Sequence, residues 1–262
     1  MKEKCDRMAG LIEAVLLAGG RNKGRLSEYT PEAWEAMIDI NGRPMAAYVV
    51  KGMLDSGRVS KVVVSGPEEL KDALSGFGDR VELVKPGGDL LESLMNAIGT
   101  TKGGKVLIAS ADIPLIDGEA VRDFVERCEA DEAEVHYALV FKEDYDRAYP
   151  SGERTYLKLR DGVLTGANMF MASKDVLLSR KQVISDMYAR RKNPLSMAAA
   201  LGIGPVMIIK FLAGMVSVSD IVAVARKSFK LEGRGVRTPY ASVAMDVDKP
   251  SDLDLARKFA RW

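Results

Sequence analysis

The 262-residue sequence predicts an α/β fold with a mostly parallel central sheet flanked by helices. Short apolar segments alternate with segments of helical period along its first half, which is typical of β-α-β units. Two adjacent glycines, Gly19 and Gly20, follow the first apolar segment, and Asp112 follows the fourth. Ligands of such sheets bind outside the carboxyl ends of the strands, so these residues mark one edge of the sheet as a candidate site.

Each element of this pattern has its own signal. Buried parallel strands are expected where the chain is short, apolar and ended by a turn residue: residues 12–18, 61–66, 81–86 and 105–112. Helices are expected between them, over residues 43–57, 67–77, 89–101 and 117–130. Asp89 and Asp117 stand where N-cap residues belong, because a carboxylate there accepts a free amide of the first turn.

The pattern changes in the second half of the chain. Residues 133–144 and 155–172 predict longer strands, with a turn at Asp161 and Gly162. Residues 173–232 are helical in period and cationic, and we interpret them as a helical insertion or subdomain within a single domain of residues 1–262. The stretch 240–262 predicts a strand, an acidic turn and a closing helix, capped by Asp252 or by Ser251.

Composition excludes several classes of protein. The net charge of +1 gives no global basic field for nucleic acid. The two cysteines, Cys5 and Cys128, form no CxxC motif, so neither a disulfide framework nor a zinc site is expected, and a reducing cytoplasm fits. The N-terminus lacks the apolar core of a signal peptide, and no apolar run reaches the length of a membrane span. We therefore expect a cytoplasmic protein.

The loop "VLLAGGRNKGRL", residues 15–26, has the chemistry of a phosphate cradle. Glycine lets backbone N–H groups approach phosphate oxygens, and Arg21, Lys23 and Arg25 can add charge-assisted hydrogen bonds. The segment matches neither GxGxxG nor GxxxxGK[ST], which argues against a dinucleotide fold and a P-loop ATPase. A turn with solvated charges explains the loop equally well when the loop is taken alone.

The loop and several later motifs together resemble the nucleotidyltransferases related to molybdenum-cofactor guanylyltransferase (MobA-like) and to sugar-phosphate and methylerythritol-phosphate nucleotidylyltransferases. The motifs occur in the family's order: "LLAGGRNKGRL", "DINGRPM", "KPGGDLLESLMNAI", "VLIASADIPLID", "LTGANMFMAS" and "MDVDKPSDLDLA". The resemblance covers roughly residues 12–172 and 235–261. It implies a glycosyltransferase-A-like Rossmannoid fold.

The resemblance also implies roles for individual residues. It assigns nucleotide binding to the glycine loop, to the segment lining base and ribose and to the fourth strand end: Leu17, Ala18, Gly19, Gly20, Arg21, Gly88, Ser93 and Asp112. It makes Arg25 the catalytic cation and Asn168 an acceptor-binding residue. On their charge alone, Lys23 is a second candidate catalytic cation and Lys158 a second candidate acceptor-binding residue. The alternatives are a turn residue for Asn168, an exposed helix serine for Ser93 and a solvated strand lysine for Lys158.

One position departs from the family. Glu35 in "AWEAMIDINGRP" stands where these enzymes usually carry a lysine before their GxP motif. A carboxylate cannot stabilise a triphosphate as lysine does. Lys23, Arg43 or a basic side chain of the helical insertion could replace it; otherwise catalysis is weakened or the substrate differs.

Asp112, Asp248 and Asp246 are the candidate ligands of a Mg²⁺ ion. Nucleotidyl transfer uses Mg²⁺ to neutralise phosphate charge, and one or two carboxylates with substrate oxygens suffice to bind it. Asp112 follows a buried strand and precedes Ile-Pro, which keeps it at the strand end; the alternative, an N-cap, is better filled by Asp117. Asp246 and Asp248 alternate on an expected strand and should share one face, where two carboxylates repel without a cation. The resemblance favours Asp248 over Asp246.

The sequence therefore predicts a Mg²⁺-dependent transfer of a nucleoside monophosphate, from CTP or GTP, to a phosphorylated or hydroxyl small-molecule acceptor, with release of pyrophosphate. A nucleotide-sugar glycosyltransferase is disfavoured because Asp-Ile-Pro replaces the DxD motif at the fourth strand. A regulatory nucleotide-binding protein is supported by Glu35, and a dehydrogenase is the weakest alternative. His136, the single histidine, is assigned to structure. Segment 173–232 is expected to shape the acceptor pocket or a homodimer contact.

Overall fold

A computed structural model describes residues 10–190 and 203–262 of the chain. Strands of this part form an eight-stranded sheet and a separate two-stranded one. The strands of the large sheet are β1 (Ile12–Leu17), β4 (Val59–Ser65), β5 (Val81–Val84), β6 (Lys105–Ser110), β7 (Val135–Phe141), β8 (Leu157–Leu159), β9 (Gly162–Ser173) and β10 (Gly233–Arg237). The small sheet pairs β2 (Asp39–Ile40) with β3 (Arg43–Pro44).

The large sheet has the order β10-β7-β9-β6-β1-β4-β5, with β8 paired to β9. β1 pairs in parallel with β4 and β6, β4 with β5, and β10 with β7, whereas β9 runs antiparallel to its three neighbours. The predicted mostly parallel sheet is confirmed. Because β1, β4 and β6 are parallel, their carboxyl ends meet at one edge.

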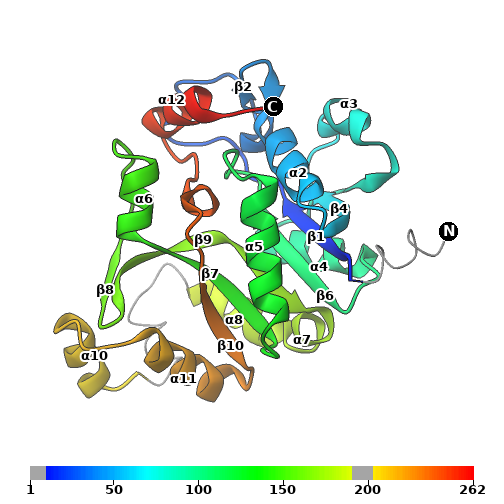
Figure 1. Ribbon diagram of the computed structural model, residues 1–262. Coiled ribbons are helices and arrows are strands. Elements are labelled where there is room, and N and C mark those ends of the chain that lie inside the picture. The colour runs from blue at the N-terminus through cyan, green and yellow to red at the C-terminus, as the bar shows by residue number, and fades with distance from the viewer. Residues whose placement is uncertain (1–9, 191–202) are drawn as a thin grey trace.

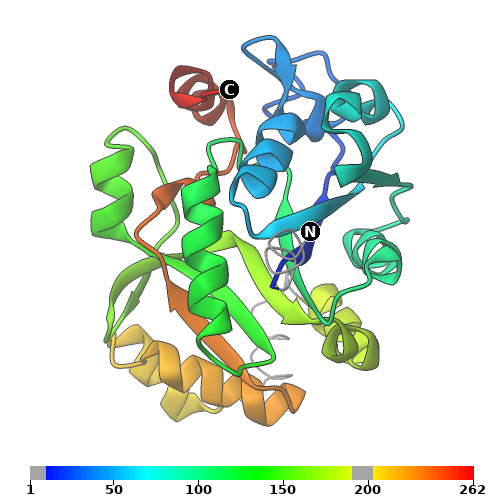
Figure 2. The ribbon, with the colours of Figure 1, turned by 45° about the vertical axis from the view of Figure 1, so that its right-hand side comes forward.

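Helices cover both faces of this sheet. They are α2 (Met45–Asp55), α3 (Leu70–Leu74), α4 (Leu90–Thr100), α5 (Gly118–Glu129), α6 (Lys142–Ala148), α7 (Lys174–Ser179), α8 (Lys181–Arg190), α10 (Pro205–Leu212), α11 (Val218–Phe229) and α12 (Pro250–Phe259). α5 lies in front of the sheet in Figure 1, and α4 and α7 lie on its other side, as Figure 2 makes clear. α12 is at one end of the molecule and α10 and α11 at the opposite end.

Strand alternation builds two cores. Ala14 and Leu16 of β1 point to the core that contains α2 and α5, while Val15 between them points to the core that contains α4. Apolar burial on both faces is what the short continuous apolar segments predict. A third cluster packs α12 against the β2–β3 hairpin.

The two predicted caps are confirmed. The Asp89 carboxylate accepts from the Glu92 amide at the start of α4, and Asp117 accepts from the Ala120 amide at the start of α5. In α12 the N-cap position belongs to Lys249, and the Asp252 carboxylate reaches back to the Lys249 amide. Asp252 therefore has the structural role expected of it, whereas the alternative cap Ser251 is wrong.

Three boundary predictions are wrong. The strand expected over residues 133–144 ends at Phe141, because Lys142–Ala148 turn into α6. The strand expected in residues 240–262 is absent from the described structure; a 3-10 helix, η3 (Ala241–Ala244), and an extended connection take its place. The helix expected over 67–77 is short, and a 3-10 segment, η2 (Ser75–Arg80), with a left-handed Gly78 follows it.

Segment 173–232 is helical where it is described, in α7, α8, α10 and α11. Its residues 191–202, which contain most of the cationic run at 189–193, lie outside the described residues. Within the described part, no helix combines the length and apolar character that crossing a membrane requires.

Candidate functional site

The glycine loop leaves the sheet at the end of β1. Ala18 is buried, and its amide donates to the Ser65 carbonyl of β4 at 2.8 Å. This hydrogen bond fixes the chain just before Gly19 and Gly20. Both glycines are closely approached: a Cβ on Gly19 would lie 2.9 Å from Pro86, and one on Gly20 would lie 2.6 Å from a carboxylate oxygen of Glu35. Pro86 therefore requires glycine at position 19, whereas the flexible Glu35 side chain could move aside for a larger residue at position 20.

This loop and the loop before α4 enclose a cavity of about 380 Å³. Most of the residues assigned to nucleotide binding and catalysis from the sequence line it: Leu17, Gly19, Gly20, Arg21, Lys23, Gly88 and Ser93. Gly87, Asp89 and Leu90 complete the lining. The structure thereby brings together two motifs that are far apart in the chain. Such a cavity has the size of a small-molecule site.

Ser93 holds one wall of this cavity in shape. Its hydroxyl accepts from the Gly87 amide at 2.9 Å and donates to the Asp89 carbonyl at 2.8 Å. The Glu92 carboxylate accepts from the Gly88 amide at 2.6 Å. The alternative of an exposed helix serine is wrong, since Ser93 is 5% exposed.

Three carboxylates meet at the same edge of the sheet. Asp112, Asp246 and Asp248 each offer one oxygen, and these oxygens all lie within 4.8 Å of one another. The chain joins them directly, because the Val247 amide donates to the Asp112 carbonyl at 2.9 Å. Val247 is buried in the α12 cluster. The strand expected around Val247 does not form, but Asp246 and Asp248 still converge with Asp112.

Asn168 of β9 bridges two of these carboxylates. Its side-chain amide donates to Asp112 at 3.3 Å and to Asp246 at 3.1 Å. Ser110 donates a further hydrogen bond to Asp112. Burial raises the pKa of Asp112, these hydrogen bonds lower it, and the charge of Asp248 raises it again. The oxygen donors match the preference of Mg²⁺, and mutual repulsion favours a bound cation.

Arg154 is a site residue that the sequence analysis missed. It forms an ion pair with Asp246, and both side chains are 13% exposed. The residue stands in the loop between α6 and β8, in a stretch without a recognisable motif, so its position follows only from the tertiary fold. Its guanidinium supplies the positive charge nearest to the three aspartates among the described ion pairs.

Glu35 also faces this acidic group. Its backbone amide donates to the Gly20 carbonyl at 3.1 Å, which fixes it beside the glycine loop. Burial, followed by the charges of Asp112 and Asp248, raises the pKa of Glu35 to about 6. Glu35 therefore adds a fourth carboxylate at the position where the resemblance leads one to expect a lysine.

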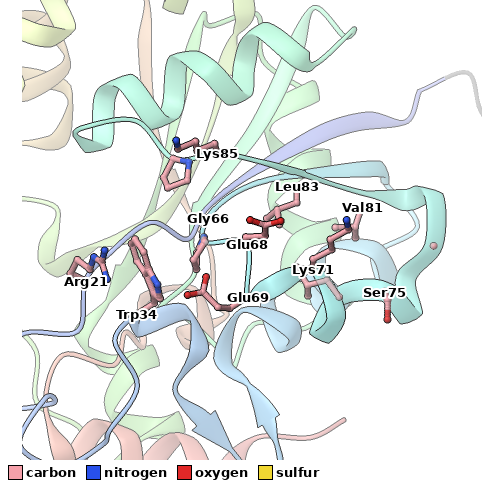
Figure 3. Close-up of a pocket in the computed structure, with 14 residues that line it drawn as sticks. Arg21, Trp34, Gly66, Glu68, Glu69, Lys71, Ser75, Val81, Leu83 and Lys85 are labelled. Atoms are coloured by element: carbon pink, nitrogen blue, oxygen red, sulfur yellow. The ribbon is translucent and has the colours of Figure 1, made fainter.

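The basic residues of the opening loop point in different directions. Arg21 stacks on Trp34, with its guanidinium carbon 3.6 Å from the ring centroid. Figure 3 shows this pair at one end of a second cavity of about 930 Å³, with Lys71 and Ser75 at the other. Lys23 is exposed on the wall of the smaller cavity. Arg25 is exposed, and its charge acts on Lys249.

Two further predicted residues lie elsewhere. Arg43 stacks on the C-terminal Trp262 at 3.9 Å, so this candidate for replacing the missing lysine is engaged away from the glycine loop. Lys158 lies exposed on the edge strand β8, with its side chain 3.9 Å from the Cβ position of Gly214. Arg43 thus contacts Trp262, and Lys158 lies next to Gly214.

Comparison with known proteins places these features in a family. Residues 14–151 match the family model of the MobA-like NTP transferase domain. A 2-C-methyl-D-erythritol 4-phosphate cytidylyltransferase of Clostridium beijerinckii is 26% identical over 179 residues, which are 66% of this chain and 72% of that protein. An 8-amino-3,8-dideoxy-manno-octulosonate cytidylyltransferase of Shewanella sediminis is 26% identical over 143 residues, or 45% of this chain and 58% of that protein.

A solved structure extends the likeness over nearly the whole chain. A hypothetical transferase from Thermus thermophilus superposes with a TM-score of 0.82 and 31% identity, covering 93% of this chain and 99% of that one. The likeness therefore includes the second half of the chain, where two of the three clustered aspartates lie.

Proposed function

Because the chain belongs to the MobA-like NTP transferase family, we propose that it transfers CMP from CTP to a small-molecule acceptor in a Mg²⁺-dependent reaction that releases pyrophosphate. Nucleotidyl transfer is the activity of the family. CTP is favoured over GTP because the two curated relatives described above are both named cytidylyltransferases. The acceptor offers a phosphate or a hydroxyl oxygen as nucleophile.

One observation carries the proposal: Asp112, Asp246 and Asp248 converge at the sheet edge where the glycine loop begins. Leu17, which lines the glycine-loop cavity, pairs with Ser110 of β6, and its carbonyl accepts from the Ala111 amide at 3.0 Å. The cavity and Asp112 are therefore built at the ends of the adjacent parallel strands β1 and β6, and the Val247 amide ties Asp246 and Asp248 to them. A triphosphate in the cavity would extend its phosphates toward the acidic group.

The chain's residues would divide the work as follows. Gly19 and Gly20 let the phosphates approach the backbone, while Lys23 and Arg21 supply charge from the loop. Asp112, Asp246 and Asp248 would hold Mg²⁺, which when bound neutralises phosphate charge and favours the departure of pyrophosphate. Asn168 holds two of the carboxylates in place. An acceptor oxygen then bonds to the α-phosphorus as the α–β bridging bond breaks, and pyrophosphate takes the electron pair.

Exchange of Asp112 for Asn tests this proposal. Asp112→Asn keeps the shape but removes one ligand charge, so pyrophosphate release from CTP in the presence of Mg²⁺ and a panel of acceptors should fall at least about 100-fold, with the fold retained by circular dichroism. The exposed Asp79→Asn is the matched control and should keep wild-type activity. Full activity of Asp112→Asn would refute the assignment. Mg²⁺-dependent CTP binding without release of pyrophosphate from CTP in the presence of any acceptor would instead indicate a regulatory nucleotide-binding protein.

A thermal-shift panel tests the choice of nucleotide. With Mg²⁺ present, CTP should raise the melting temperature more than GTP or ATP at equal concentration, because only binding to the native state is stabilising. A larger shift with GTP would contradict the cytidylyl assignment while leaving nucleotidyl transfer in place.

A further inference from the structure

A large apolar cavity lies between the sheet and helices α7, α8 and α11. Its volume is about 790 Å³, and its walls are mainly aliphatic and aromatic side chains of β7, β8, β9 and these helices. The charged residues that line it within the described structure are Arg180 and Arg234, and no carboxylate does so. Apolar walls around a volume of this size are typical of a small-molecule site.

The face of β9 that lines this cavity also carries Asn168, which binds two of the three carboxylates. The pairing of β9 with β7 shifts register between Gly166 and Phe170, but Ala167 and Met169 both pack in the core that contains α2 and α5. The residues that alternate with them, Gly166, Asn168 and Phe170, therefore share the opposite face. Gly166 and Phe170 line the apolar cavity, and Asn168 between them binds Asp112 and Asp246. One strand face therefore passes directly from apolar wall to candidate reaction centre.

Tyr137 marks the polar end of the cavity. A Cβ on Gly166 would lie 2.5 Å from the Tyr137 hydroxyl, so glycine is what allows the ring to lie across β9. Arg154 is close enough for its charge to lower the pKa of Tyr137, against the larger effect of burial, which raises it. Arg154 is thus near Tyr137, which lines the cavity, and is paired with Asp246, and its guanidinium suits a phosphate.

From this arrangement, and resting on the proposed function, we infer that the acceptor is an amphiphile: a hydrocarbon chain that occupies the apolar cavity and carries a terminal phosphate beside Arg154 and Asn168. In the reaction an oxygen of that phosphate bonds to the α-phosphorus of CTP, the α–β bridging P–O bond breaks, and pyrophosphate leaves with the electron pair. The acceptor becomes a cytidine diphosphate ester. A phosphate is already anionic, so the step needs no base to remove a proton.

A series of n-alkyl monophosphates tests the acceptor class. Butyl, hexyl and octyl phosphate are titrated into the full chain below their critical micelle concentrations, with binding followed by calorimetry. Burial of the chain should tighten binding about three- to fourfold for each added methylene. The same affinity at every chain length would overturn the inference.

Two variants on one helix locate the binding. Ala225→Trp adds bulk to the cavity wall and should abolish the gain with chain length. Ala223→Trp is the matched control, because Ala223 is exposed on the same helix, α11, and does not line this cavity; it should keep the gain. A gain that survives in Ala225→Trp would place the alkyl chain elsewhere and contradict the inference.

Other occupants give different results. If residues 191–202 fill the cavity, Ala225→Trp lowers the melting temperature; if a second copy of the chain fills it, the variant lowers the oligomeric mass. In either case the affinity for alkyl phosphates does not depend on chain length, and the inference is overturned. Affinity for CTP with Mg²⁺ is measured on the same samples. Intact CTP binding without chain-length dependence contradicts only the acceptor class, whereas absent CTP binding contradicts nucleotidyl transfer itself.

Discussion

At the scale of single residues, the ion pair of Arg154 with Asp246 offsets part of the repulsion among the clustered carboxylates. Asp112, Asp246 and Asp248 repel one another, and Glu35 adds to this charge. Arg154 compensates one of these charges through its ion pair. Stability and metal binding should therefore be linked at this residue.

Exchange of Arg154 for Gln should expose that link. The variant leaves Asp246 without its partner, so the free energy of unfolding in EDTA should fall by about 2 kcal/mol. Mg²⁺ should restore more stability to the variant than it adds to the wild type, because the ion takes over the compensation. Urea unfolding with EDTA and with Mg²⁺ measures both values.

The control for this experiment is a surface arginine. Arg147→Gln breaks an ion pair with Asp144 in which the arginine side chain is 75% exposed, so its effect should stay below about 0.5 kcal/mol in either buffer. Equal responses of the two variants to Mg²⁺ would contradict the role of Arg154.

His136 should make stability depend on pH. The imidazole is 1% exposed in β7, with Nε2 3.3 Å from Asp131. Burial lowers its pKa, and the charges of Lys105 and Arg234 lower it further against the opposing effect of Asp131. The folded state therefore binds this proton less readily than the unfolded chain, and stability is lost as the pH falls below about 6.5.

The variant His136→Gln isolates this contribution. Urea unfolding at pH 7.5 and pH 5.5 should show a larger loss of stability on acidification for the wild type than for the variant. The raised pKa of Glu35 acts in the opposite direction, but it is present in both proteins and cancels in the comparison. A wild type that loses no more than the variant would contradict the lowered pKa of His136.

At the scale of elements, glycines set how closely α2 meets the chain that follows Asp112. A Cβ on Gly52 would lie 2.5 Å from the Ile116 carbonyl oxygen, and one on Gly118 would lie 2.8 Å from the Asp55 backbone. Both obstacles are backbone atoms, which cannot rotate away. The helix and the loop after β6 are therefore held at one separation.

Gly52→Ala should destabilise the protein by about 1–3 kcal/mol, since the added methyl overpacks this contact. The matched control is Gly99→Ala in α4, where a Cβ would meet nothing within 4 Å. That exchange should stabilise by about 0.5–1 kcal/mol through the better helix propensity of alanine. Opposite signs in thermal unfolding support the packing argument; a neutral Gly52→Ala would refute it.

The elements that the sequence predicted well are those whose local signals agree with their burial. β1, β4 and β6 are short apolar segments buried on both faces, and α4 and α5 begin with their own cap residues. α6 was missed because the predicted strand was extended to Asp144, and the charged residues of Lys142–Ala148 carry no apolar helical period. β10 was missed because Gly233 and Gly235 interrupt its strand pattern. The strand expected near Asp246 fails because Val247 is held by the Asp112 carbonyl rather than by a neighbouring strand.

The candidate site divides in the same way. Asp112 and the glycine loop could be predicted, because residues at the ends of parallel strands meet wherever the sheet forms. Arg154 could not, because its pairing with Asp246 depends on how the loop before β8 folds back. The acidic surroundings of Glu35 likewise depend on contacts between distant segments, and the sequence indicated only that the residue is unusual.

At the scale of the whole molecule, Cys128 reports on the integrity of the fold. Its side chain is fully buried in the α2–α5 core, and burial raises the pKa of the thiol to about 12. Cys5 lies outside the described residues, so a Cys5→Ser protein is used. Its remaining thiol should react with a disulfide reagent only at the rate of global unfolding, and that rate should rise with urea.

An exposed cysteine supplies the reference rate. Ser75→Cys, made in the same Cys5→Ser background, places a thiol on the surface of η2. This exposed thiol should react with one equivalent of the disulfide reagent without waiting for unfolding. Fast labelling of Cys128 in native buffer, far ahead of unfolding followed by circular dichroism, would contradict a rigid core.

The long stretch of chain between Asp112 and the pair Asp246 and Asp248 has a consequence for biosynthesis. The matched family segment, residues 14–151, emerges from the ribosome with the glycine loop and Asp112 already made, whereas Asp246 and Asp248 are synthesised only after it. A nascent chain can thus assemble most of its sheet and still be unable to close the acidic trio. Cation binding would then act as a checkpoint that only a polypeptide translated beyond Asp248 passes.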